Sequence, residues 1–125
     1  KEAVVGKVFD VTSVPTGWAE ENPETLSKFL AITAEMNAMY AKDRAPMMEG
    51  IQKEAGMDME GTTAVIDVFA FPTVAEQLSD AWMGKFLAEY LTDAAASLEA
   101  GGKIKALADY NAVINTSYLE AASKM

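Results

Sequence analysis

The sequence predicts a mostly α-helical protein with one N-terminal β-strand, and three observations lead to this prediction. The one clear strand pattern stands at residues 4–13. Most of the remaining chain carries apolar residues at the spacing of an α-helix, with Pro, Gly and capping residues at the expected helix ends. No apolar run approaches the roughly 20 residues that a membrane helix needs. We therefore expect one domain's worth of a soluble chain, or a part of something soluble.

The strand is predicted at residues 4–13, which read VVGKVFDVTS. β-Branched and aromatic residues dominate this stretch, and it contains no Pro. Because successive side chains of a strand point to opposite faces, Asp10 and Thr12 should share one face and Phe9 should lie on the other. Residues 14–17 (VPTG) then form a turn or short link to the helical part.

The first long helix is predicted from Pro23 to about Ala41, after a single turn at residues 18–21. Asn22 can cap the free backbone amides, Pro23 suits the first helical position, and Glu24 suits the positive end of the helix dipole. Apolar side chains then recur at helical spacing to the end of the segment. This is the most clearly marked helix of the chain.

Two shorter helices should follow. One has a proline at its start and ends at Gly56, which can adopt the left-handed conformation of a C-cap. Asp58 can cap the other, which runs to roughly Asp67, although its β-branched residues suit a strand as well. Since the residue before a proline avoids the helical region, a short extended piece is predicted at residues 68–71, just before Pro72.

A continuous helix is predicted from Thr73 until Gly101 and Gly102 stop it. Trp82 falls on the apolar stripe of this segment, so core packing is its expected role. Asp109 can then cap a last helix, after which the tail should fray.

The composition of the chain excludes several classes of function. The net charge is −9, with 10 basic against 19 acidic residues, which disfavours nucleic acid and anionic membranes as partners. The chain has no Cys and no His. Disulfides, thiolate metal sites and a Ser-His-Asp triad are therefore excluded. We predict that the chain is not an enzyme, that it needs no cofactor, and that it has no metal site.

Few residues stand out as candidate binding groups. Asp10, within the predicted strand, is either solvated or a contact for the cationic group of a ligand. The methionines, which cluster at Met47-Met48 and near Met57, suit either core filling or an adaptable recognition surface. Trp18 precedes a helix start and is expected to pack there.

Three stretches of the chain carry a family resemblance. They are residues 9–11 (FDV) with 18–24 (WAEENPE), residues 71–78 (FPTVAEQL), and residues 98–104 (LEAGGKI) followed by Asp109-Tyr110. In this order and spacing they resemble periplasmic solute-binding proteins of ABC transporters of the taurine/alkanesulfonate (nitrate/sulfonate-like) family. The sequence departs from the family pattern at Gly101, where Gln is usual, and at Asn111, where Ser is usual.

The resemblance implies a fold of two α/β lobes that close on a ligand, of which this chain would be the C-terminal part. Residues 1–17 would be the strand and hinge link that returns from the second lobe. Residues 18–125 would be the helical part that completes the first lobe. The chain begins at Lys1 without Met, so we expect a fragment or a processed piece whose targeting signal is missing.

The resemblance also implies a function. The protein would be periplasmic or extracellular, soluble or lipid-anchored. It would capture a taurine- or sulfonate-like small organic anion or zwitterion and deliver it to an ABC transporter permease. By position, Asp10 matches the acidic residue of the family's F-D pair and would meet the ammonium of the ligand. Phe9 and Thr12 are the weaker ligand-binding neighbours.

A second interpretation remains open. The chain could be a free-standing helical interaction or structural module that associates through its apolar helix faces. A piece cut from a larger protein would expose apolar patches, and could self-associate or pair with the missing N-terminal part.

Overall fold

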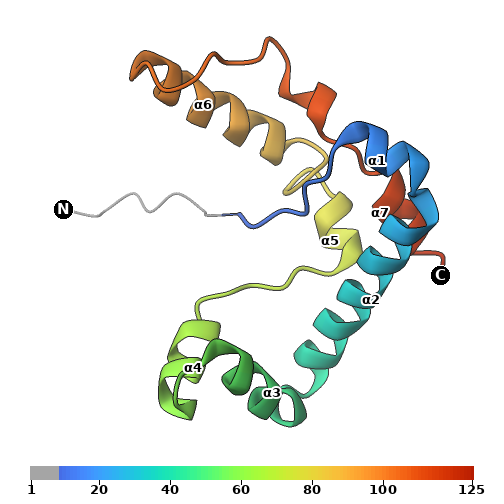
Figure 1. Cartoon of the computed structure of the whole chain (residues 1–125), viewed down its shortest axis with the longest axis vertical. Coiled ribbons are helices and arrows are strands. Elements are labelled where there is room, and N and C mark those ends of the chain that lie inside the picture. Colours follow the sequence, from blue (N-terminus) through green and yellow to red (C-terminus); the bar gives the residue numbers. More distant parts are fainter. Residues whose placement is uncertain (1–8) are drawn as a thin grey trace.

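The computed structural model describes residues 9–125, and every regular element within that range is a helix (Figure 1). In chain order the elements are α1 (Thr16–Glu21), α2 (Pro23–Lys42), α3 (Ala45–Ala55), α4 (Met59–Ile66), α5 (Val74–Leu78), α6 (Phe86–Ala100), the 3-10 helix η1 (Tyr110–Val113) and α7 (Ser117–Ala122). The described chain is therefore a small all-α fold. The expected α/β lobes of a periplasmic binding protein are wrong for this part of the chain.

The predicted N-terminal strand is also wrong where it can be checked. Residues 9–15 have no regular secondary structure, while residues 4–8 of the predicted strand lie outside the described residues. A strand needs a neighbour that pairs with its backbone N–H and C=O groups. The described residues offer only helices, so the strand-like composition of residues 9–13 has no sheet to join.

The extended piece expected at residues 68–71 forms no strand either. Val68 and Phe69 continue α4 as a turn, because their N–H groups donate to the carbonyls of Val65 and Ile66 at 3.2 and 3.1 Å. An irregular link over residues 69–73 then leads to α5. The restriction that a proline places on the preceding residue breaks the helix here, as expected, without making a strand.

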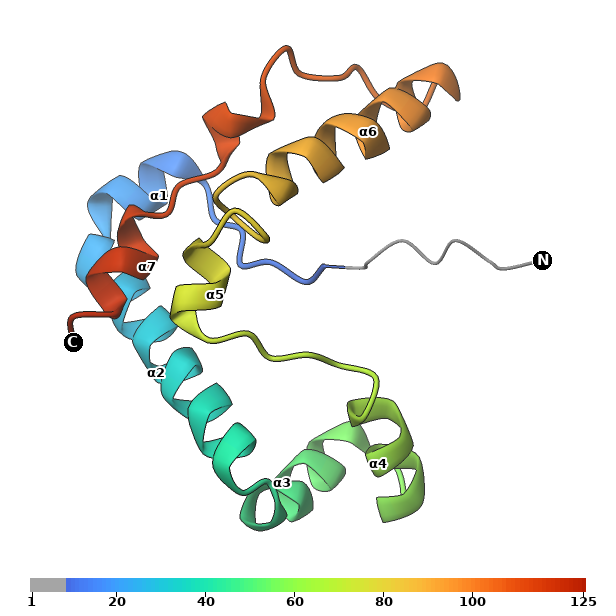
Figure 2. The same ribbon diagram turned by 180° about the vertical axis from the view of Figure 1, so that it is seen from behind.

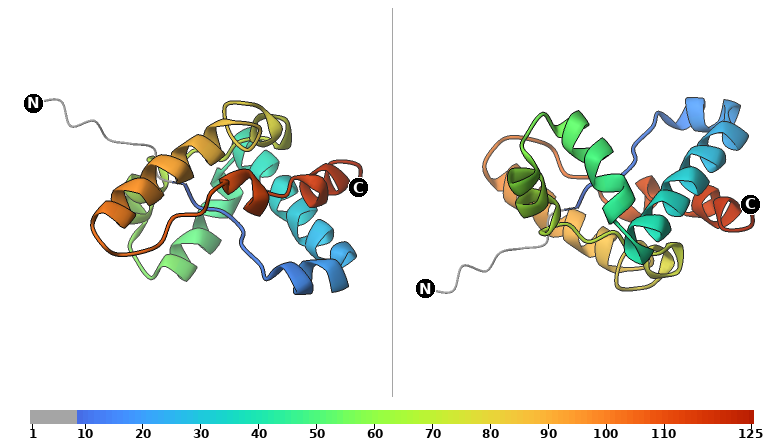
Figure 3. Two further views of the ribbon diagram at one scale, coloured as in Figure 1. Left: turned by 90° about the horizontal axis from the view of Figure 1, so that it is seen from above. Right: turned by 90° about the horizontal axis from the view of Figure 1, so that it is seen from below.

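The helices form an open arrangement along one long axis. In Figure 1, α6 lies at one end, α3 and α4 lie at the other, and α2 runs along one side between them, with α5 near the middle; Figure 2 shows the same order from behind. The most extensive helix contact joins α2 to α7, and smaller ones join α3 to α4, α6 to η1, and α1 to α2. The irregular segment before α1 runs through the middle of this open arrangement of helices (Figure 3).

The buried apolar side chains are few and small for a chain of this length. They are Ala19, Leu26, Met48, Leu87, Ala88, Ala95, Leu119 and Ala122. Two of the larger buried side chains, Leu26 and Leu119, lie on α2 and α7, the two helices that share the most extensive contact. Many larger apolar side chains stay exposed. No helix among residues 9–125 is both long and apolar enough to cross a membrane.

Several helix ends confirm the sequence prediction. α2 spans Pro23–Lys42, Gly56 ends α3 with a φ of +66°, and the Asp58 carboxylate accepts the Gly61 N–H at 2.7 Å at the start of α4. The predicted cap of α2 is wrong. The Asn22 side chain donates to the Trp18 carbonyl at 2.9 Å, and so closes α1 instead of opening α2.

The continuous helix expected from Thr73 is interrupted between α5 and α6. At the end of α5, both the N–H and the hydroxyl of Ser79 donate to the Glu76 carbonyl, at 3.1 and 2.6 Å. The chain then turns tightly at Gly84. A Cβ there would lie 2.8 Å from the Asp80 carboxylate and 2.9 Å from the Ser79 carbonyl, which only glycine avoids.

The last predicted helix is divided in two. The Asp109 carboxylate accepts the Asn111 N–H at 2.9 Å, which confirms its capping role, but it caps only the short η1. The chain is extended at Ile114, and α7 begins three residues later at Ser117. Upstream, Gly102 adopts a φ of +68° just after α6, where the sequence predicted a stop.

The start of α5 carries a complete capping box, which gives a pH-dependent prediction. The Thr73 hydroxyl accepts the Glu76 N–H, and the Glu76 carboxylate accepts the Thr73 N–H at 2.7 Å and the Thr73 hydroxyl at 2.8 Å. These hydrogen bonds from Thr73, the backbone one first, lower the pKa of Glu76 below its usual 4.5. Their contribution to stability is therefore present above the usual glutamate pKa, and it is lost as the pH falls through the lowered value.

We expect Thr73→Ala to return the pKa of Glu76 part of the way toward 4.5 and to fray α5, because the hydroxyl bonds disappear while residue 73 keeps its backbone N–H. Titration of the Glu76 carboxyl carbon by NMR measures the shift directly. Ser123→Ala, which removes a hydroxyl bond to the Glu120 carbonyl in another helix, serves as the control. An unchanged Glu76 titration in Thr73→Ala would contradict the contribution of the Thr73 hydroxyl to the lowered pKa.

Candidate functional site

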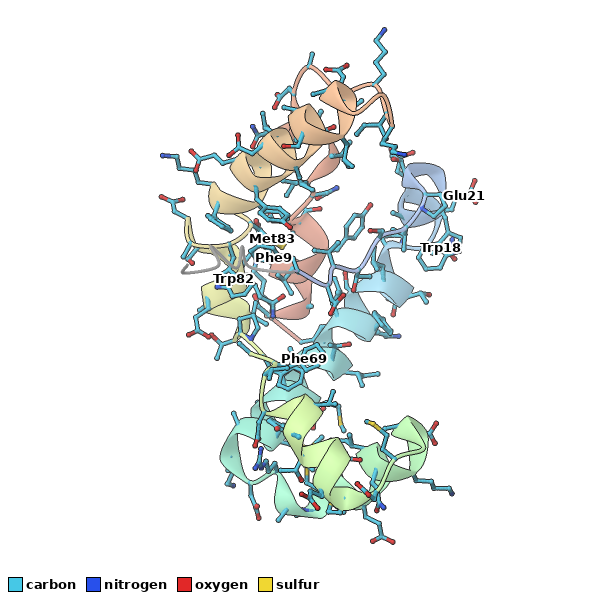
Figure 4. All side chains as sticks on the ribbon, turned by 90° about the vertical axis from the view of Figure 1, so that its left-hand side faces the viewer. Phe9, Trp18, Glu21, Phe69, Trp82 and Met83 are labelled. Atoms are coloured by element: carbon cyan, nitrogen blue, oxygen red, sulfur yellow. The ribbon has the colours of Figure 1, made fainter. Side chains whose placement is uncertain are left out.

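Phe9 is held in a cluster of aromatic rings. Its ring centroid lies 5.0 Å from that of Trp82 in an edge-on contact, 5.1 Å from that of Tyr90, and 5.5 Å from that of Phe86. Figure 4 shows Phe9 beside Trp82 and Met83, between α6 and the link that precedes it. Each well-placed aromatic pair adds about 0.5–1.5 kcal/mol beyond the burial of its area. The cluster therefore fixes the irregular N-terminal segment at Phe9.

Local sequence explains how the three partner rings converge. Phe86 and Tyr90 are four residues apart on α6, so they lie on one face of the helix, with ring centroids 6.3 Å apart. Trp82 belongs to the turn before α6. That turn is closed by hydrogen bonds from the Leu87 N–H to the Trp82 carbonyl at 2.8 Å and from the Phe86 N–H to the Asp80 carbonyl at 3.0 Å.

The other two predicted ligand contacts lie on the surface next to this anchor. Asp10 and Thr12 are both exposed, and neither makes a hydrogen bond or an ion pair with any residue of the range 9–125. Asp10 follows directly after the fixed Phe9. The structure thus places the three predicted residues within one short segment, with an aromatic side chain packed inward and a carboxylate that water can reach.

The exposed Asp10 carboxylate suits recognition of a cation, because a carboxylate binds an ammonium group through a charge-assisted hydrogen bond. The neighbouring Phe9 ring packs against other rings of the protein. Nothing in the sequence around residues 9–12 signals that Trp82, Phe86 and Tyr90 surround Phe9. Only the spacing of Phe86 and Tyr90 shows in advance that they share a helix face.

A hollow of about 390 Å³ lies between α6 and η1. It is lined by Ala88, Glu89, Thr92, Asp93 and Asn111. Two of its polar side chains already have partners. Glu89 forms an ion pair with Lys85 at 3.5 Å, and the Asn111 amide donates a hydrogen bond to the Asp109 carboxylate at 3.0 Å. The described residues contain no group of three or more carboxylates that could hold a metal ion.

Comparison of the chain with family models, with curated proteins and with solved structures finds no match. The resemblance to solute-binding proteins therefore rests on its three sequence stretches alone. The main feature of the candidate site is the position of Asp10 beside the aromatic cluster around Phe9.

Proposed function

We propose that this chain is the helical part of a solute-binding protein that captures a small organic anion or zwitterion of the taurine or sulfonate kind for an ABC permease. The observation that carries the proposal is the placement of Asp10. Its exposed carboxylate follows a ring that three aromatic side chains hold in place. This is the same Phe-Asp pair that carries the sequence resemblance.

In this proposal Asp10 binds the ammonium end of the solute. Taurine carries an ammonium and a sulfonate, and its ammonium would donate to the Asp10 carboxylate. The Thr12 hydroxyl, two residues away, offers a further acceptor or donor. A hydrogen bond to a charged partner contributes about 1.5–3 kcal/mol when water is excluded. Because Asp10 is exposed, another part of the protein has to cover the bound solute, as a second wall of the site.

The test is calorimetric titration of the longer protein that this proposal implies, with taurine and with alkanesulfonates. We expect Asp10→Asn to weaken taurine binding about tenfold or more, since the loss of one charged hydrogen bond has that effect. Glu20→Gln, which removes an exposed carboxylate on α1, should leave the affinity unchanged. Absence of heat with every one of these solutes would sink the ligand class.

One observation favours the second candidate, a helical module that associates through apolar faces. α2 exposes Phe29 and Ile32, at 55% and 61%, and the half-exposed Met36 and Met39 follow at helical spacing. Soluble monomers rarely expose large contiguous apolar patches. Light scattering of the 125-residue chain separates the candidates. A mass that rises with concentration supports association, whereas a monomer with a sharp unfolding transition supports an independent domain.

A further inference from the structure

An apolar hollow of about 230 Å³ lies at the end of the molecule farthest from α6, where α2, α3 and α4 meet. Its lining consists of Met36, Asn37, Tyr40, Met47, Ile51, Ile66 and Phe71. We call it the α2–α3–α4 hollow. None of the residues placed in the predicted ligand site belongs to it, so it needs an explanation of its own.

The walls of the hollow are fixed by specific contacts. The Tyr40 and Phe71 rings meet edge to face with their centroids 5.0 Å apart. Arg44 donates to the Tyr40 hydroxyl at 3.3 Å and also pairs with Asp67, which joins the two chain ends of the α3–α4 pair. The hydrogen bond to Asp67 raises the pKa of Arg44 further, so the Arg44 guanidinium stays charged at neutral pH. These contacts therefore hold the walls of the hollow in place.

Acidic side chains lie next to lining residues in the chain. Glu54 lies three residues after Ile51 on α3, so helical spacing brings it near the lining, and Asp43 ends α2 three residues after Tyr40. Both are exposed, and neither forms an ion pair with the described residues. Residues 36–71, which span the whole lining, contain six acidic and three basic residues, and one of the basic residues, Arg44, is already paired with Asp67. The surroundings therefore carry a net negative charge, although Lys42 and Lys53 offset part of it.

We propose that the α2–α3–α4 hollow receives one large apolar side chain from a basic amphipathic helix. The size fits, because a cavity of roughly 150 Å³ already holds a benzene ring. Two methionines in the lining can adjust to the shape of an inserted side chain. Helices that bind in this way place apolar anchors in a groove and charged residues beside it.

The negative charge around the hollow favours a basic helix over a second copy of this chain or an anionic membrane. A basic helix complements Asp43 and Glu54, which favours encounter and orientation. A second copy of this chain would bring its own charge of −9 toward the same acidic surface. An anionic membrane would be repelled for the same reason. The proposal does not depend on the solute-binding function, since it concerns a different part of the fold.

The test uses fluorescence anisotropy with a labelled peptide of Leu and Lys arranged as an amphipathic helix. We expect the 125-residue chain to bind this peptide and to bind the matching Leu/Glu peptide far more weakly. Met36→Gln should weaken binding about fivefold, because part of the apolar contact is lost. Met39→Gln is the matched control, since Met39 lies on the same helix, is 50% exposed against 44% for Met36, and does not line the hollow.

Three results would overturn the proposal. They are no binding of the Leu/Lys peptide, equal binding of a scrambled peptide of the same composition, and equal losses in Met36→Gln and Met39→Gln. Met36→Leu keeps an apolar side chain of similar size, so it should retain the binding that Met36→Gln loses. Circular dichroism of each variant shows whether a loss reflects unfolding, and the Met36→Leu comparison decides the matter if Met36→Gln fails to fold.

Discussion

Replacing Leu119 by alanine is expected to lower the free energy of unfolding by about 2–4 kcal/mol. Leu119 is only 5% exposed and lies on α7, which packs against α2 in the largest helix contact of the described chain. α7 has six residues, far fewer than an isolated helix needs to persist in water. Its folding therefore depends on burial against α2, so the substitution removes both a core side chain and the support of a helix.

Urea denaturation followed by circular dichroism measures this change. Val113→Ala is the control, because Val113 is 61% exposed and its truncation should cost less than about 0.5 kcal/mol. Leu26→Ala, on α2, should also destabilise the protein strongly, since Leu26 is 5% exposed. If Leu26 and Leu119 stabilise the same helix contact, the losses of the double variant will fall short of their sum. Equal stabilities of Leu119→Ala and Val113→Ala would show that α7 does not depend on this contact.

The helix ends that were predicted correctly depend on local signals. Pro23 opens α2 because its fixed φ suits the first turn, and Gly56 ends α3 because it can adopt a positive φ. Asp58 caps α4 through an amide only three residues away. Each of these effects acts within one turn of chain, so the sequence alone contains the information.

The errors arose where distant parts of the chain decide the outcome. The segment around Phe9 has strand composition, but a strand requires a partner, and among residues 9–125 there is none. The helix predicted through Trp82 is broken because a tight turn at Gly84 brings α6 to its position beside Phe9. Neither the missing partner nor the turn is visible in the periodicity of apolar residues.

The candidate site was predictable only in part. Asp10 stood out as a carboxylate within a strand-like stretch, and the resemblance to a family added Thr12; the structure places both on the surface beside Phe9. The rings that fix Phe9 come from residues more than seventy positions later in the chain, at Trp82 and Tyr90. No pattern near Phe9 points to them, so the anchor of the site could be found only from the fold.

Replacing Phe9 by alanine is expected to release the N-terminal segment from α6. The change removes three ring contacts, and the expected loss of stability is about 1–3 kcal/mol, because Phe9 is only half-buried. Trp82, whose ring lies 5.0 Å from Phe9, reports the change through its fluorescence. The measurement uses a Trp18→Phe background, so that the emission comes from Trp82 alone. In that background Phe9→Ala should shift the emission toward the red, as water reaches the indole.

The same variant connects packing with function. In the proposed solute-binding protein, Phe9→Ala keeps the Asp10 carboxylate but no longer holds it in place, so affinity for taurine should fall although the carboxylate that binds the ammonium is kept. Phe9→Leu keeps most of the apolar volume and loses only the ring geometry, so its effect on both measurements should be smaller. Unchanged Trp82 emission in Phe9→Ala would contradict the aromatic anchor. A red shift with unchanged taurine affinity would instead show that the anchor exists and that Asp10 does not need it.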